Sequence, residues 1–346
     1  MEEFALIRHL TDRPPGRRTA AETHLVVGIG DDAAVTELTP GMQLVLSCDT
    51  MVQDVHFNSK TMSMYDIGWK AMASNVSDMA AMGAVPRNAL VALTVPASVP
   101  ADRLRELYAG LYACADRYGV ALAGGDTTST PGGLTVTVTV TGEVEPGRAL
   151  LRSAARPGDA VFVTGWPGRS AAGLHALLAA GARPEAAADE PIPEEAFPPP
   201  VRGLVAAHRR PEPSVAAGRR LLAGGAAPAL NDISDGLSSE AWEIAEASGC
   251  GLLLREADIP VAPELKAYAD AVGASALEWI LTGGEDYVLL GTLPEEAMAV
   301  TAEAFAAEGL PFFRIGTATS AFAGVRLVGI DGEERPVAKS GYNHFG

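Results

Sequence analysis

The sequence predicts an α/β protein of two domains, and three observations support this fold class. Apolar strand-like runs alternate with helical patterns in both halves of the chain. The length of 346 residues suits two domains at roughly 100–200 residues each. The composition shifts near Pro157-Gly158, where a new strand and a new helix begin. We therefore expect domains at 1–150 and 151–346.

The first half predicts a mixed sheet with helices. Apolar positions Leu104, Leu107 and Leu111 recur near every 3.6 residues, which is typical of a helix packed on one face. Residues 134–141 alternate Leu or Val with Thr, which indicates a strand with one buried face. The expected strands are 25–27, 43–48, 89–95, 119–123 and 134–141, and the expected helices are 4–10, 66–82 and 101–117.

The second half predicts a further α/β domain. Its expected strands are 160–164, 228–233, 250–254, 286–292, 312–316 and 324–330, and its expected helices are 171–179, 214–222, 238–248, 263–272 and 295–307. Residues 183–200 are rich in Pro, Ala and Glu, so we expect a loop there. Whether this loop closes over a site stays open.

Charge and cysteine content exclude several classes of protein. Lys and Arg number 26 against 43 Asp and Glu, a net charge of −17, so binding to nucleic acid phosphates is not expected. Any anionic substrate would need cations beside it. Three distant cysteines make neither a disulfide framework nor a zinc pair. The chain shows no signal peptide and no membrane-spanning apolar run, so we expect a cytoplasmic protein with no membrane partner.

The stretch Gly28-Ile29-Gly30-Asp31-Asp32-Ala33 fits the dinucleotide pattern G-x-G-x-x-A after a strand. We reject that interpretation on electrostatic grounds. Asp31 and Asp32 stand where a pyrophosphate would bind, and like charges repel unless a metal intervenes. A turn that needs flexible glycine explains the pattern at least as well.

Acidic residues recur at the ends of the expected strands, next to small residues. A single carboxylate in that place is usually a helix cap or a turn former. Eight such residues, with a ninth inside a helix, are harder to explain as caps and turns alone, because clustered carboxylates repel one another and are costly to desolvate. Mg²⁺ offsets that cost, since it binds carboxylate oxygens together with substrate phosphates. The residues are Asp31, Asp32, Asp49, Asp126, Asp232, Asp235, Glu285 and Asp286, with Asp78 in the helix.

Other phosphate-binding and catalytic patterns are missing from the sequence. None of the four lysines follows a P-loop pattern, and neither the protein-kinase elements nor a G-x-S-x-G elbow occurs. His56 read alone is more often structural than catalytic. Residues 340–346 read alone are an ordinary docked tail.

Eight strings together resemble the thiamine-monophosphate kinase family, within the superfamily of aminoimidazole ribonucleotide synthetase. The set runs in the family's order over nearly the whole chain, and its VHF string and GY-x-HF tail are specific to this branch. The strings are GIGDDAAV (28–35), LSCDTMVQDVHF (46–57), NVSDMAAMGAVP (75–86), GGDTT (124–128), GRALLRS (147–153), DISDGLSSE (232–240), LTGGEDY (281–287) and KSGYNHF (339–345).

This resemblance implies a fold, a reaction and partners. It implies two α/β domains of the synthetase-like fold, with an N-terminal mixed sheet that pairs with its copy in a homodimer. It implies ATP-dependent phosphorylation of thiamine monophosphate to thiamine diphosphate, the last step of that biosynthesis, with several Mg²⁺ ions. The number of metal ions and any K⁺ requirement stay open. The purine-pathway, selenophosphate and hydrogenase-maturation enzymes of the superfamily, and a non-catalytic nucleotide-binding dimer, remain as alternatives.

The resemblance also assigns roles by motif. The implied magnesium ligands are Asp32, Ser47, Cys48, Asp49, Asp78, Asp126, Asp232 and Asp235. The implied ATP contacts are Gly125, Asp126, Arg152 and Ser234, and the implied thiamine contacts are His56, Glu285 and Tyr342. Cys48 stands where the family often has Thr, so ligation by its backbone carbonyl or by its side chain stays open. We expect no dedicated general base, since the acceptor phosphate is already mostly a dianion at neutral pH. Asp78 and the Mg²⁺ cluster are the expected catalytic elements.

Overall fold

The computed structural model describes residues 3–12, 24–181 and 190–342. The chain forms two compact units that alternate along the sequence. The first comprises Met1–Met79, Val85–Pro146 and Leu177–Pro193, and the second comprises Ala80–Ala84, Gly147–Ala176 and Glu194–Gly346. The functional division into domains 1–150 and 151–346 stays a prediction.

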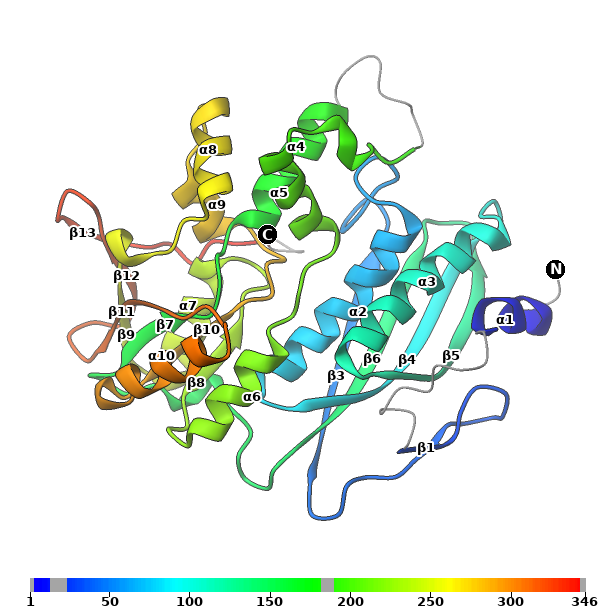
Figure 1. Ribbon diagram of the computed structural model, residues 1–346, viewed down its shortest axis with the longest axis horizontal. Coiled ribbons are helices and arrows are strands. Elements are labelled where there is room, and N and C mark those ends of the chain that lie inside the picture. Colours follow the sequence, from blue (N-terminus) through cyan, green and yellow to red (C-terminus); the bar gives the residue numbers. More distant parts are fainter. Residues whose placement is uncertain (1–2, 13–23, 182–189, 343–346) are drawn as a thin grey trace. The chain divides into compact units, whose positions relative to one another are not determined.

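A four-stranded mixed sheet in the order β3-β6-β4-β5 frames the first unit (Figure 1). Its strands are β3 (Gln43–Val52), β4 (Val85–Pro96), β5 (Ala121–Thr130) and β6 (Thr135–Val144). β6 pairs antiparallel with β3 and with β4, whereas β4 and β5 run parallel. The Thr/Val alternation of β6 is confirmed as one buried face, since Val136, Val138 and Val140 are fully buried.

Helices α2 (Met64–Ala81) and α3 (Ala101–Tyr118) lie side by side along one face of this sheet (Figure 1). Two glycines let the helices approach closely. A Cβ on Gly68 would lie 2.0 Å from the Leu107 carbonyl oxygen, and one on Gly110 would lie 1.9 Å from that of Tyr65. This close contact fixes α2, which carries Asp78, over the sheet. The unit also contains α1 (Glu3–Thr11), β1 (Leu25–Val27) and β2 (Val35–Thr36).

The opposite face of the sheet carries exposed apolar side chains. Leu44 and Leu46 on β3 are 48% and 64% exposed, and Leu90 on β4 is 43% exposed. Successive strand residues point to opposite faces, so this open face is the one away from the buried valines. An apolar surface of this kind typically marks an interaction site.

The second unit is built on a seven-stranded sheet in the order β13-β12-β9-β11-β7-β10-β8. Every pair is antiparallel except β12 with β9. The strands are β7 (Ala160–Val163), β8 (Ala229–Asp232), β9 (Gly251–Arg255), β10 (Leu289–Leu293), β11 (Phe313–Thr319), β12 (Gly324–Val328) and β13 (Glu334–Pro336). The α-helices are α4 (Arg169–Gly181), α5 (Pro199–Arg209), α6 (Val215–Gly224), α7 (Leu237–Ser248), α8 (Pro263–Val272), α9 (Ala276–Thr282) and α10 (Met298–Ala307).

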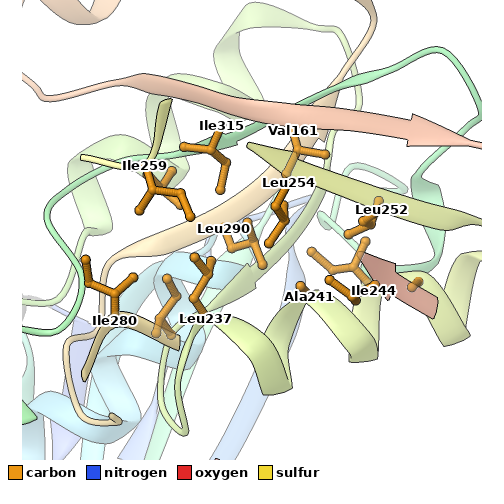
Figure 2. Packing of buried hydrophobic residues seen from close by; sticks show 14 of the residues in the cluster. Val161, Leu237, Ala241, Ile244, Leu252, Leu254, Ile259, Ile280, Leu290 and Ile315 are labelled. Carbon is orange, nitrogen blue, oxygen red and sulfur yellow. The ribbon is translucent and has the colours of Figure 1, made fainter. Parts of the chain in front are cut away.

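The core of the second unit lies between this sheet and α7 (Figure 2). Leu237, Ala241 and Ile244 recur on one face of α7, and all three are fully buried. They pack with strand residues such as Leu252 and Leu290. The core therefore fixes the position of α7, and with it the side chains of Glu240 and Glu243 on the same helix.

Several expected boundaries are wrong. The strand expected to end at Ala123 continues as β5 to Thr130, because Gly124, Gly125 and Asp126 pair with β4. The strand expected to end at Cys48 continues as β3 to Val52. Part of the 183–200 loop is helical, since α5 begins at Pro199, and residues 182–189 lie outside the described residues. No helix of the described residues is both long and apolar enough to cross a bilayer.

Two α-helices and two short strands of the described residues were not expected. They are α5, α9, β2 and β13. α9 has a readable signal, because Ser275 precedes it and its side chain accepts a hydrogen bond from the Glu278 backbone N–H, as in a capping box. α5 also has one, since prolines favour the first positions of a helix.

Candidate active site

Ser47, Asp49 and Asp78 form an oxygen-rich group in the first unit. Ser47 and Asp49 are two residues apart on β3, so both side chains face α2. The Ser47 hydroxyl donates a hydrogen bond to Asp78 Oδ2 on α2. The Asp49 backbone N–H donates to Asn75 Oδ1, one turn before Asp78, at 3.0 Å. Strand and helix are thus locked together where the acids lie.

The environment of Asp49 disfavours its charged form. Burial raises the pKa of the Asp49 carboxyl. A hydrogen bond from Ser74 and the nearby His56 act in the opposite direction and offset only part of the effect. The His56 ring is oriented by the backbone, because Val52 N–H donates to its Nδ1 at 3.0 Å. Nδ1 is therefore the acceptor, and the neutral ring carries its proton on Nε2.

Cys48 points away from this group. Its neighbours on β3 face α2, so its own side chain lies on the open face, where Thr139 Oγ1 contacts the sulfur at 3.3 Å. The Cys48 side chain therefore does not join Ser47, Asp49 and Asp78, which leaves its backbone carbonyl as the group that could act as a ligand.

Gly125 and Asp126 lie on β5, at the other edge of the sheet from β3. Gly125 packs directly on β4, since a Cβ there would lie 1.8 Å from the Val91 carbonyl oxygen. Asp126 is exposed and pairs in register with Ala92. Three strand spacings separate β3 from β5, which amounts to about 14 Å. Asp49 and Asp126 of one chain are therefore not neighbours.

Asp32 lies in the exposed loop between β1 and β2. Its backbone N–H donates to the Asp31 carboxylate at 2.9 Å. β1 continues into β2 in an antiparallel pair, and not into a helix. The rejection of the dinucleotide pattern is confirmed, because that site needs the N-terminus of a helix after the strand.

In the second unit, Arg152 is held by a branched polar network. The Arg152 Nε donates to Asn231 Oδ1 at 2.9 Å, and its Nη1 lies 3.0 Å from Glu243 Oε2. Asn231 Nδ2 donates in turn to Glu243 Oε2 at 3.0 Å and to Glu240 Oε2. Arg152 belongs to the short 3₁₀ helix η2 (Arg152–Ala154), Asn231 to β8, and both glutamates to α7.

The turn after β8 is bound to the same glutamate. Glu240 Oε1 accepts from the Asp235 backbone N–H at 3.0 Å and from Ser234 Oγ at 3.3 Å. Burial, followed by the charge of Glu243, raises the pKa of the Glu240 carboxyl. Asp232, at the end of β8, is buried.

Glu285 has a strained backbone, with φ of +66°. Its N–H donates to the Ser234 carbonyl at 2.7 Å, which ties it to the turn after β8. Its carboxylate lies 3.5 Å from Nδ1 of the buried His208. Tyr342 reaches the same turn, since its backbone N–H donates to the Asp235 carbonyl at 3.3 Å. The described part of the chain thus brings Ser234, Asp235, Glu285 and Tyr342 together, while Asn343 to Phe345 of the tail string lie outside it.

Asp286 supports the helix beside this turn. Its carboxylate accepts hydrogen bonds from the backbone N–H groups of Gly168 and Ser170, where α4 begins, at 2.5 and 2.9 Å. Burial raises the pKa of Asp286 to about 7, although these hydrogen bonds act in the opposite direction. This acid stabilises the fold around Glu285.

Within the described residues, no three His, Cys, Asp or Glu side chains gather as a metal site by themselves. A site with only one or two carboxylates still suits Mg²⁺, because this ion usually completes its coordination shell with waters and substrate phosphates. The donors in the first unit are oxygen atoms, as hard cations prefer.

Sequence reasoning missed Asn231, Glu240 and Glu243 as partners of Arg152. A signal was present, because Glu240 and Glu243 are three residues apart on the expected helix 238–248 and so share a face. Asn231 directly precedes the Asp232 motif. What sequence could not reveal was that Arg152 lies beside them.

Family models match most of the chain. AIR synthase related protein, N-terminal domain, matches residues 30–144, and AIR synthase related protein, C-terminal domain, matches residues 156–328.

Named relatives are similar over their whole length. The thiamine-monophosphate kinase of Bacillus subtilis (strain 168) is 41% identical over 345 residues, which is 100% of each chain. Among solved structures, thiamine-monophosphate kinase from Stenotrophomonas maltophilia K279a is 32% identical with a TM-score of 0.78, covering 97% of this chain and 96% of that one. AaThiL complexed with AMPPCP and TMP is 31% identical with a TM-score of 0.76, covering 92% of each chain.

Proposed function

This chain belongs to the thiamine-monophosphate kinases of the AIR synthase related family, and from that membership we propose how its residues act. It is an ATP-dependent kinase that phosphorylates thiamine monophosphate to thiamine diphosphate. The observation that carries this function is the 41% identity to a named kinase over the entire chain. The related AaThiL complex with AMPPCP and TMP supports both substrates.

We propose that Arg152 and the turn after β8 contact ATP. Arg152 supplies a fixed positive charge, and its hydrogen bonds to Asn231 and Glu243 hold the guanidinium in place. Ser234 and the Gly125 backbone are the other proposed contacts. A side chain at Gly125 would collide with β4, so the strand leaves its bare backbone for the nucleotide.

Mg²⁺ would be held by Asp32, Ser47, Asp49, Asp78, Asp126 and the Cys48 carbonyl in the first unit, and by Asp232 and Asp235 in the second. Mg²⁺ supplies charge neutralisation and alignment of the phosphates when it is bound. Two like unit charges about 4 Å apart repel by about 4 kcal/mol at an effective dielectric constant near 20. In a chain of net charge −17 that repulsion makes metal binding by these oxygens essential to the proposal.

Glu285, Tyr342 and His56 are the proposed thiamine contacts. The thiazolium ring is cationic, so a carboxylate and an aromatic face both attract it. The Glu285 carboxylate lies beside His208, and the Tyr342 backbone is bound to the same turn. His56 presents its Nε2 proton as a donor, because Nδ1 accepts from Val52.

The proposed reaction is direct in-line transfer of the γ-phosphoryl group from ATP to the acceptor phosphate. That phosphate has its second pKa near 6, so it is already a nucleophile at neutral pH. No residue needs to remove a proton. The chain's own contribution is to bind and orient both reactants, which can supply a large part of the rate.

We also propose a homodimer in which the sites are shared between two copies. The open face exposes Leu44, Leu46 and Leu90, and β3 and β5 are the edges of their sheet. Two such sheets joined edge to edge would close into a barrel, in which the backbone N–H and C=O groups of the edge strands are hydrogen-bonded. Asp126 of one copy would then stand beside Asp49 of the other. A cytoplasmic location stays a prediction from the sequence.

A coupled assay of ADP release, with and without thiamine monophosphate, tests the function. We expect release to depend on thiamine monophosphate and to stop when divalent ions are chelated. The remaining candidate, a non-catalytic nucleotide-binding dimer, predicts nucleotide binding without any substrate-dependent release.

A further inference from the structure

Asn231 and Glu240 lie at the centre of the network around the proposed ATP contacts, although neither is assigned a contact with a substrate. We propose that the two are positioning residues, which hold the Arg152 guanidinium and the Ser234–Asp235 turn in one fixed arrangement for ATP. The proposal rests on the ATP-binding roles given above to Arg152 and Ser234.

The contacts join two separate pieces of chain. On one side, Asn231 Oδ1 accepts from Arg152 Nε at 2.9 Å. On the other, Glu240 accepts from the Asp235 N–H at 3.0 Å and from Ser234 Oγ at 3.3 Å. The hydrogen bond from Asn231 Nδ2 to Glu240 Oε2 connects the two sides. Arg152 and the turn are far apart in sequence and are joined through this link.

The direction of the hydrogen bonds makes the pair specific. Arg152 can only donate, so the Asn231 amide must turn its oxygen toward Arg152 and its nitrogen toward Glu240. Glu240 must then accept on both oxygens, from Asn231 on one and from the turn on the other. The two oxygens of the Glu240 carboxyl meet both demands in the structure, whereas a glutamine amide offers one accepting oxygen and one donating nitrogen. Glutamine at 240 would place a donor against a donor on one side.

Burial prevents water from repairing such a mismatch. Asn231 is 1% exposed and Glu240 is 2% exposed. A buried donor left without an acceptor carries its full desolvation cost. Core packing of α7 through Ala241 and Ile244 keeps the glutamate from moving away.

The test is Glu240→Gln in the full chain, with binding of AMPPCP and Mg²⁺ measured by calorimetry. We expect affinity for AMPPCP to fall about tenfold or more, because the mismatched amide would displace either Arg152 or the Ser234–Asp235 turn. The KM for ATP should rise to a similar extent, while the KM for thiamine monophosphate stays within about twofold. Glu303→Gln, an exposed glutamate on α10, is the matched control and should bind as the wild type does.

The two KM values separate positioning of the nucleotide contacts from a purely structural role, because a general loss of folded protein would lower kcat and would not raise the KM for ATP alone. Wild-type affinity for AMPPCP in E240Q, or an equal rise in both KM values, overturns the proposal. A wild-type chain that binds AMPPCP but releases no ADP with thiamine monophosphate would overturn the function and leave this comparison valid.

Discussion

Ser47 on β3 donates a hydrogen bond to Asp78 on α2, across 31 positions of sequence. This contact places the helix acid over the strand that also carries Asp49. The close approach of α2 and α3 through Gly68 and Gly110 keeps the helix there. The proposed metal ligands of the first unit are thus set by the packing of the helices on the sheet.

The first prediction concerns Asp78. Asp78→Asn keeps the size of the side chain and can still accept from Ser47, so the protein should stay folded. It removes the negative charge that Mg²⁺ requires, and turnover should fall by at least about a hundredfold. Steady-state ADP release and circular dichroism measure the two effects. Near-wild-type turnover would remove Asp78 from the metal site.

The second prediction separates the two substrate contacts. Glu285→Gln removes the charge opposite the thiazolium ring but keeps the backbone hydrogen bond to Ser234. The KM for thiamine monophosphate should rise about tenfold, with the KM for ATP little changed. Initial-rate kinetics with each substrate varied in turn measures this. A change confined to ATP would show that Glu285 belongs to the nucleotide site.

The third prediction tests the shared sites. D49N and D126N should each be inactive alone as homodimers. After mixing and exchange of copies, a mixed dimer holds one site with both aspartates intact and one site with neither. About a quarter of wild-type activity should therefore return, since half of the dimers are mixed and carry one working site each. If both aspartates of a site come from one chain, mixing restores nothing.

The fourth prediction concerns pH and stability. The pKa of Asp286 is about 7 in the folded chain, against an ordinary value of 3.8. The folded state therefore binds more protons than the unfolded state between these values, so the free energy of unfolding decreases as pH rises from about 4 to 7. One such group contributes at most about 1.4 kcal/mol per pH unit.

Asp286→Asn has no proton to lose at this position, so its unfolding free energy should fall less steeply over the same pH range. Urea unfolding of both proteins at several pH values measures the difference. Glu303→Gln serves as the control, because that carboxylate is exposed. Parallel curves for wild type and D286N would contradict the assignment.

Much of the fold was readable because the patterns are local. The Thr/Val alternation of residues 134–141 and the Leu104, Leu107 and Leu111 spacing follow directly from strand and helix geometry. The extension of β5 through Gly124 and Gly125 was not readable. Glycine and aspartate usually end a strand, and only the close approach of β4 explains why they continue one here.

The site was readable as a set of motifs but not as a network. Residue types and the family likeness gave Asp49, Asp78, Arg152 and Glu285. The partner of Arg152 could not be inferred, because Asn231 is distant in sequence and lies beside it only through the fold. The sheet order, which separates Asp49 from Asp126, likewise depends on long-range strand pairing.

In the proposed mechanism, Asp49, Asp78 and Asp126 hold divalent ions against the phosphates of both reactants. The most direct measurement is anomalous diffraction from Mn²⁺ in crystals of the wild-type chain grown with AMPPCP and thiamine monophosphate. Several Mn²⁺ peaks are expected within coordination distance of the Asp49, Asp78 and Asp126 carboxylates and of phosphate oxygens. Well-ordered nucleotide and substrate with no metal peak at these carboxylates would contradict this mechanism.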